Sequence, residues 1–153
     1  MSNLSGPIIA ENTTWLSIVS QLFSTRMTML LKPHGLTLGQ FSILHHIARQ
    51  RLLGGNRVSD IAAAVEVGQP AVTKALQKFQ AMGLVDLDVS QTDKRATHVR
   101  PRPEAAQLLE TIHKDIGPDL FKTFGSLGDD DAAQFAELLK RLGSWLDKNR
   151  LSQ

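Results

Sequence analysis

The chain contains no cysteine among its 153 residues. Disulfides, thiolate metal sites and thiol-based redox sensing are therefore excluded, and a reducing compartment is the natural environment. The sequence also has no apolar run approaching the roughly 20 residues that cross a bilayer. Its first residues lack the basic start and apolar stretch of a secretory signal. These absences predict a cytoplasmic protein with no membrane partner.

The usual sequence patterns of catalysis are missing as well. There is no glycine-rich phosphate loop, and only the histidines suggest metal ligands. His45 and His46 are adjacent, so on a helix they point about 100° apart and do not easily face one ion. We expect no catalytic residues, no metal and no cofactor. An enzyme is the less favoured interpretation, because catalysis needs a convergent set of groups that this sequence does not suggest.

Charge is weak overall but unevenly distributed. The net charge is +2. Residues 1–56 hold four Lys/Arg against one acid, residues 57–102 hold seven against five, and residues 103–153 hold six against nine. A polyanion would therefore meet the earlier parts of the chain before its acidic last third.

Apolar periodicity predicts a mainly helical protein with one small β-hairpin. The expected order is a long helix ending at Pro33, a helix after Thr37, a short helix, a tight turn and a fourth helix. Ser59 is the expected N-cap of the short helix. Strands at 84–89 and 96–99 form the hairpin, and Pro101 and Pro103 should stop the second strand and open a long helix. This order describes a winged helix-turn-helix.

The fourth predicted helix, from about Gln69 to Met82, has two different faces. One is apolar and should pack on the preceding helices, and the other is polar, basic and free of carboxylates. A helix that enters the major groove of DNA needs such a face. An ordinary amphipathic surface helix remains the alternative. The apolar face consists of Val72, Ala75, Leu76 and Phe79, and the polar face of Pro70, Thr73, Lys74, Gln77 and, nearer its edge, Lys78.

Basic residues also crowd the tip and return strand of the predicted hairpin. A charge run is usually a solvated face. Here it directly follows a candidate recognition helix, which favours a wing that reaches phosphate or the minor groove. The residues are Lys94, Arg95, His98, Arg100 and Arg102.

Residues 58–99 resemble the DNA-binding core of the MarR family of bacterial regulators. The resemblance rests on the opening VSDIA, the Val72-Thr73 pair, the exit Met82-Gly83-Leu84-Val85 and the pattern Asp93-x-Arg95. The flanking stretches LTLGQFSILHHIA and LGDDDAAQFAELLKRL resemble the second and last helices of that family. The resemblance thus covers nearly the whole chain.

The resemblance implies a single domain over residues 1–153, with a winged-helix DNA-binding lobe at about 37–100 and dimerisation helices at about 10–35 and 103–150. It implies a homodimeric, sequence-specific transcriptional regulator of double-stranded DNA, acting as a repressor. Arg95 would reach the minor groove while Asp93 holds its guanidinium. The expected DNA-binding residues are Ser59, Gln69, Pro70, Thr73, Lys74, Gln77, Lys78, Asp93, Lys94, Arg95 and Arg100.

The sequence departs from the family pattern after the wing. Family members carry a run like Leu-Thr-x-x-Gly there, and this chain has Val99-Arg100-Pro101-Arg102-Pro103. The resemblance therefore does not define the path of the chain from the wing to the next helix. The additional arginines are expected to add phosphate contacts.

The terminal helices carry more apolar surface than a small winged-helix core needs. Pairing across a two-fold axis would cover it, although a compact monomer that buries it remains the alternative. The stripe on the last helix consists of Phe135, Leu138, Leu139, Leu142, Trp145 and Leu146.

An effector is suggested only by the family resemblance. Many relatives bind a small molecule between the dimerisation helices and the DNA-binding lobe, which would place a small aromatic or amphipathic ligand near His34, Phe41, His45 and His113. The alternative function is a winged-helix module for protein contact without DNA binding. Such a module should present an apolar or acidic recognition face.

Overall fold

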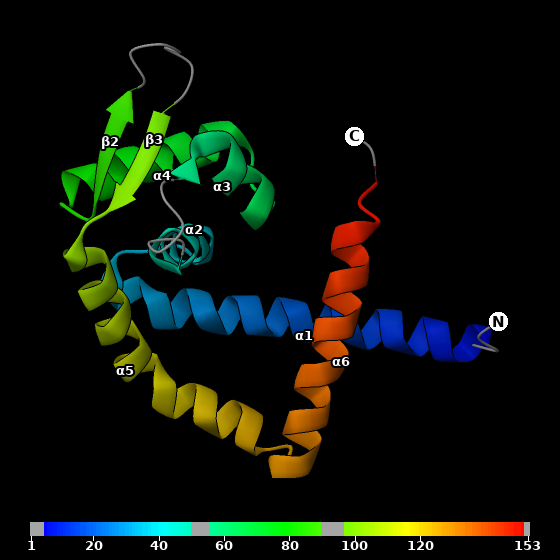
Figure 1. Cartoon of the computed structure of the whole chain (residues 1–153). Coiled ribbons are helices and arrows are strands. Elements are labelled where there is room, and N and C mark those ends of the chain that lie inside the picture. The colour runs from blue at the N-terminus through cyan, green and yellow to red at the C-terminus, as the bar shows by residue number, and fades with distance from the viewer. Residues whose placement is uncertain (1–4, 50–55, 90–96, 152–153) are drawn as a thin grey trace. The chain divides into compact units, whose positions relative to one another are not determined.

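The computed structural model describes residues 5–49, 56–89 and 97–151. The chain divides into two compact units, one ending at Ile112 and the other beginning at His113. The helices and strands, labelled in Figure 1 where there is room, are α1 (Gly6–Leu31), the short 3-10 helix η1 (Lys32–His34), α2 (Leu38–Arg49), β1 (Asn56–Arg57), α3 (Val58–Val65), α4 (Gln69–Ala81), β2 (Val85–Val89), β3 (Thr97–Pro101), α5 (Pro103–Gly125) and α6 (Asp129–Lys148). The expected mainly helical winged helix-turn-helix is confirmed.

The start of α2 is fixed by its own side chains. The backbone N–H of Gln40 donates to Thr37 Oγ1 at 3.1 Å, and the backbone N–H of Thr37 donates to Gln40 Oε1 at 3.2 Å. This reciprocal pair is a capping box, which satisfies two backbone donors that have no partner within the helix. Gly35, at φ 67°, makes the left-handed turn that precedes it.

The helix-turn-helix consists of α3, a short turn and α4. The prediction that Ser59 caps α3 is wrong, because the helix begins at Val58 and its N-cap residue is Arg57. Arg57 is extended (φ −79°, ψ 149°) since it belongs to β1, so the helix starts directly after the strand. Glu66 ends α3 in a left-handed conformation (φ 52°). Pro70 lies in the first turn of α4, as predicted, where a missing N–H costs nothing.

The sheet has three antiparallel strands in the order β1-β3-β2. The sequence pattern predicted the hairpin but not the two-residue strand β1, which pairs Arg57 with His98. The expectation that Pro101 stops the return strand is wrong, because Pro101 is the last residue of β3 and stands opposite Val85. A proline is tolerated at a strand end, where no ladder hydrogen bond needs its missing N–H.

The core of the first unit is formed by residues of helices α1 to α4, the inner face of the sheet and the first part of α5. In Figure 1, α2 lies between α1 and the α3–α4 pair. The predicted inner face of α4 is confirmed, since none of its four members is more than 2% exposed. This packing fixes which side of α4 faces outward. The buried core side chains include Ile43, Leu44, Ile47, Ile61, Val72, Ala75, Leu76, Phe79, Val85, Val99, Leu109 and Ile112.

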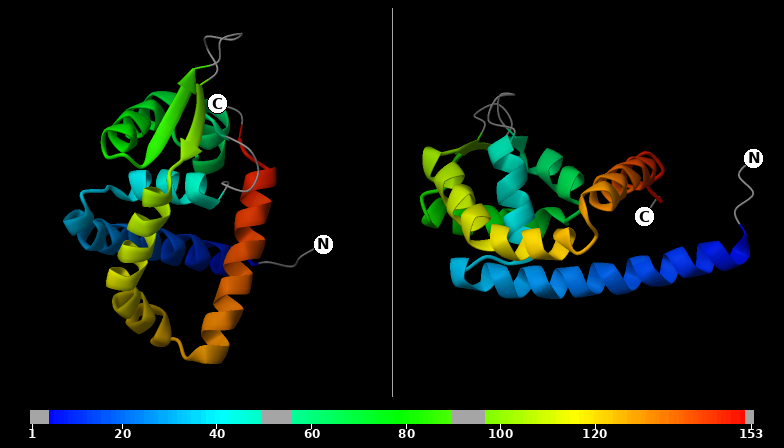
Figure 2. Two further views of the ribbon diagram at one scale, coloured as in Figure 1. Left: turned by 60° about the vertical axis from the view of Figure 1, so that its left-hand side comes forward. Right: turned by 90° about the horizontal axis from the view of Figure 1, so that it is seen from below.

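Large apolar side chains remain exposed on α1 and α6. Figure 2 shows α1 as one unbroken helix, and every residue of it from Gly6 to Phe23 is exposed. Helix α6 has no buried residue. Within the described residues, no helix has both the length and the apolar character of a membrane-crossing segment.

Candidate nucleic-acid interface

The outer face of α4 is built as the sequence predicted. Gln69, Pro70, Thr73, Lys74 and Gln77 are all exposed. Their spacing of three and four residues places them on one side of the helix. Because the opposite side is packed in the core, this polar face is held outward by tertiary contacts. Helix α4 contains no carboxylate, so nothing on the helix itself would repel phosphate.

Lys78 differs from these five residues. It is half-buried, and its ammonium group donates to the carbonyl oxygen of Gly35 and, at 3.0 Å, to Gln40 Oε1. The Lys78 ammonium group, which we expected to contact phosphate, therefore has hydrogen-bond acceptors within the protein. Sequence reasoning missed this role because the partners lie 43 and 38 residues away.

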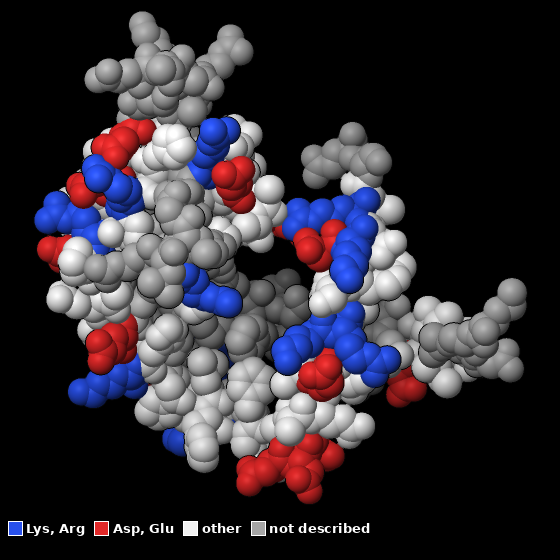
Figure 3. Space-filling model, in the orientation of Figure 1, with Lys and Arg blue, Asp and Glu red and all other residues white. Residues whose placement is uncertain are grey.

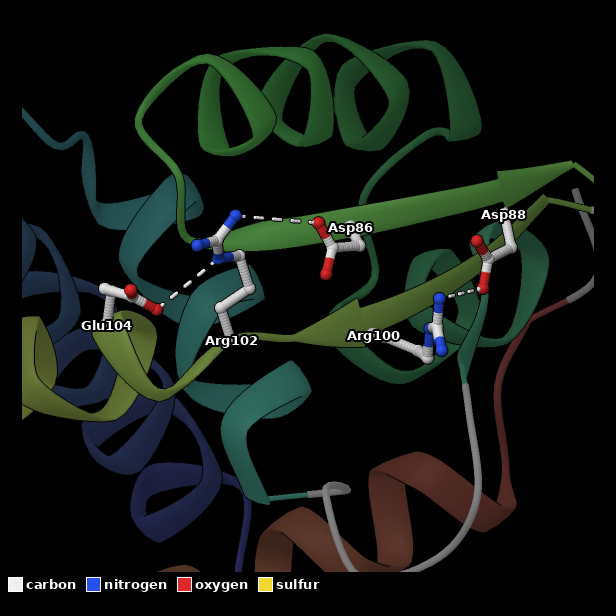
Figure 4. A network of polar contacts seen from close by, with 5 residues as sticks. All are labelled: Asp86, Asp88, Arg100, Arg102 and Glu104. Carbon is white, nitrogen blue, oxygen red and sulfur yellow. Dashed lines mark hydrogen bonds and ion pairs between the residues drawn. The ribbon is translucent and has the colours of Figure 1, made fainter.

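The arginines after the wing face acids. Arg100 lies 2.8 Å from Asp88, and Arg102 lies 3.8 Å from Asp86 and 3.5 Å from Glu104 (Figure 4). These pairs are exposed and contribute little to stability, about 0–1 kcal/mol each. They do offset the positive charge of the hairpin stem. Figure 3 likewise shows basic and acidic side chains intermingled over this part of the surface.

Arg102 also holds the connection between the hairpin and α5. Its backbone N–H donates to the carbonyl oxygen of Leu84 at 2.9 Å, and its side chain reaches both Asp86 of β2 and Glu104 in the first turn of α5. The pKa of Glu104 lies below its usual value, first because a backbone N–H donates to the carboxylate and then because Arg102 does. The additional arginine thus joins the strand to the helix.

The histidines were considered for a metal site, and three of them, together with Phe41, for an effector site. Among residues 5–49, 56–89 and 97–151, no three His, Asp or Glu side chains come together in a way that could hold an ion. On α2, the rings of Phe41 and His45 lie 6.0 Å apart between centroids and are tilted by 39°. His34 lies in η1 of the same unit, whereas His113 begins the second unit.

Comparison with known proteins finds one matching family. Residues 34–96, from the end of η1 through the helix-turn-helix to the hairpin, match the sequence model of the MarR family. The middle of the chain is therefore similar to the MarR family. No curated protein matches this sequence.

Several solved structures share the fold over most of the chain. A MarR protein from Peptoclostridium difficile is 21% identical with a TM-score of 0.72, covering 97% of this chain and 92% of that chain. A mutant of the E. coli MarR protein complexed with operator DNA is 25% identical with a TM-score of 0.70, covering 92% and 99%. The Bordetella bronchiseptica protein BpsR, whose DNA binding is regulated by 6-hydroxynicotinic acid, is 20% identical with a TM-score of 0.73, covering 87% and 98%.

The predicted wing tip lies outside the described residues. Asp93, Lys94 and Arg95 fall in that segment, and their expected roles stay predictions. Ser59, the expected contact from α3, is exposed. The structure thus brings the α4 residues together on one face, and it gives Lys78 and Arg100 partners within the protein.

Proposed function

We propose that this chain is a homodimeric transcriptional repressor of the MarR type that binds double-stranded DNA in a sequence-specific way. The observation that carries the proposal is the exposed, carboxylate-free face of α4, held outward by a buried apolar face. In this proposal α4 enters the major groove, with Gln77 near the centre of its outward face. The E. coli relative complexed with operator DNA supports it.

Dimerisation is proposed from the exposed apolar surface of the terminal helices. Leu142 and Leu146 of α6 are 43% and 52% exposed, and Trp15 and Leu22 of α1 are 58% and 65% exposed. Single exposed apolar residues are normal, but long stripes of them mark surfaces that associate. A two-fold dimer would present two α4 helices about one DNA turn apart. In it, residues 37–100 form the DNA-binding lobe, and residues 10–35 and 103–150 pair with the second copy.

Effector control is part of the proposal. BpsR supports it, because an aromatic acid regulates the DNA binding of that protein. We propose a small aromatic or amphipathic ligand near His34, Phe41 and His45 of the first unit, and the expected role of His113 stays a prediction. The protein would work in the cytoplasm, where a regulator of this kind meets its operators, and it would have no catalytic activity.

The test is selection of binding sites from random duplexes, followed by gel shifts at several salt concentrations. We expect one enriched sequence with two-fold symmetry, and weaker binding to random duplex that falls steeply with salt. Failure to bind any duplex at low salt would favour the alternative, a winged-helix module for protein contact.

A first prediction concerns the wing tip. If the Asp93 carboxylate braces the Arg95 guanidinium, Asp93→Ala should weaken DNA binding by up to about tenfold. Pure electrostatics predicts the opposite sign, because removing an acid near phosphate should tighten binding. Titrations of wild type, Asp93→Ala, Arg95→Ala and the double variant decide between them. Bracing requires that the Asp93 effect disappear once Arg95 is absent.

A second prediction concerns the hairpin stem. Asp88→Asn should release Arg100 from its 2.8 Å ion pair, so the variant should bind every duplex more tightly, with a salt slope steeper by about one unit. Affinities measured across a salt series provide the test. In the matched control, Asp88→Asn combined with Arg100→Gln, the gain should be absent. Equal tightening in both backgrounds would mean that only the lost negative charge matters.

A further inference from the structure

A small polar network joins α4 to the start of α2. The Lys78 ammonium group donates to the carbonyl oxygen of Gly35 and to Gln40 Oε1. The same Gln40 oxygen accepts the backbone N–H of Thr37 at 3.2 Å. One amide oxygen thus serves both the capping box of α2 and the lysine of α4.

Both anchor points of Lys78 have fixed positions. The Gly35 backbone is held in its left-handed turn by the hydrogen bond from its N–H to the carbonyl oxygen of Lys32, at 3.0 Å. The Gln40 side chain is held by the capping box. A flexible lysine that donates to two fixed acceptors ties its own helix to them.

The position of Lys78 on α4 determines what these hydrogen bonds do to the helix. Lys78 follows Gln77 directly and lies one turn after Lys74, between the exposed face and the buried Phe79. The apolar core fixes the rotation of α4 only coarsely, because apolar contacts have little directional preference. Hydrogen bonds to two defined oxygens restrict that rotation further.

We propose that Lys78 is a positioning residue that fixes the rotation of α4, and that it makes no phosphate contact. The inference rests on the proposed DNA binding of α4. Base-edge hydrogen bonds depend steeply on geometry, whereas a long lysine can follow a displaced phosphate. Loss of Lys78 should therefore reduce discrimination between sequences more than general affinity for DNA.

The test compares Lys78→Met with Lys74→Met on the selected site and on random duplex, over a salt series. For Lys78→Met we expect about tenfold weaker binding to the selected site. Binding to random duplex and the salt slope should be unchanged. For Lys74→Met we expect weaker binding to both duplexes and a slope flatter by about one unit. A partly unfolded preparation lowers the active fraction for both duplexes alike, so the ratio of the two affinities is insensitive to it.

Substitution of the partner tests the same contact without removing the lysine charge. Gln40→Met deletes Gln40 Oε1, one of the two acceptors of Lys78, and should reproduce part of the loss of discrimination. Adding Lys78→Met to it should cause a smaller further loss than Lys78→Met causes alone. Gln40→Glu keeps an acceptor for both Lys78 and Thr37 and should retain discrimination. Circular dichroism confirms that each variant is helical.

Other results would contradict the positioning role of Lys78 or the proposed DNA binding itself. If Lys78→Met flattens the salt slope as Lys74→Met does, Lys78 contacts phosphate, and the inference is wrong while DNA binding stands. If Lys78→Met leaves both affinities unchanged, or if it costs as much discrimination in the Gln40→Met background as in wild type, the inference is also wrong. If the wild-type protein binds no duplex, the proposed function fails and the inference fails with it.

Discussion

Replacing both Leu142 and Leu146 by aspartate is expected to convert a dimer into a folded monomer. The two leucines are 43% and 52% exposed on the protomer, so aspartate at these positions meets water there and leaves the protomer intact. In the proposed dimer the same carboxylates would be buried without partners, at a cost of several kcal/mol. Sedimentation at micromolar concentration should give about twice the chain mass for wild type and about one chain mass for the variant.

The opposite side of α6 offers a matched control. Lys140 and Ser144 are exposed and have the same four-residue spacing as the two leucines. Lys140→Asp combined with Ser144→Asp should therefore remain dimeric. A wild-type protein that sediments as a monomer would contradict the dimer, as would a leucine variant that stays dimeric.

Replacing Gln77 and Lys74 separately is expected to change DNA binding in two different ways. If Gln77 reads a base edge, Gln77→Ala should cost about 1–3 kcal/mol on the selected site and relax the preference at one base pair. Lys74 is an exposed lysine on the same face, and its loss should weaken all duplexes alike and flatten the salt slope by about one unit. Repeated site selection with each variant, together with titrations over a salt series, measures both effects.

Thr111 provides the control for these substitutions. It is an exposed residue of a different helix, α5, and its hydroxyl donates to the carbonyl oxygen of Gln107 in the same helix at 3.0 Å. Thr111→Ala should leave affinity and preference unchanged. Unchanged binding after replacement of both Gln77 and Lys74 would mean that α4 does not enter the groove.

In this proposal the hairpin and α4 contribute differently to the affinity for DNA and to the sequence preference. The stem arginines have carboxylate partners at Asp86, Asp88 and Glu104. A stem of balanced charge adds little non-specific attraction for phosphate. Affinity would then depend on the wing tip and on Lys74, and sequence preference on the outward face of α4.

Much of this fold could be predicted from the sequence, because its signals are local. The three- and four-residue spacing of Val72, Leu76 and Phe79 defined the buried side of α4, and it therefore defined the exposed side as well. Pro70 marked the first turn of the same helix. Helix periodicity and the preferences of proline act within one or two turns, so the sequence alone determines them.

The tertiary structure decided which charged side chains are available to a partner. From the sequence, Lys74, Lys78 and Arg100 were all expected to contact DNA, and Arg102 was expected to add a phosphate contact. The fold brings Lys78 to oxygens of Gly35 and Gln40, and the strand register brings Arg100 and Arg102 to Asp88 and Asp86. Strand β1 and the displaced start of α3 at Val58 likewise depend on the pairing of Arg57 with His98. Such contacts join residues far apart in the chain, so no local pattern encodes them, and the fold determines which cations have partners within the protein.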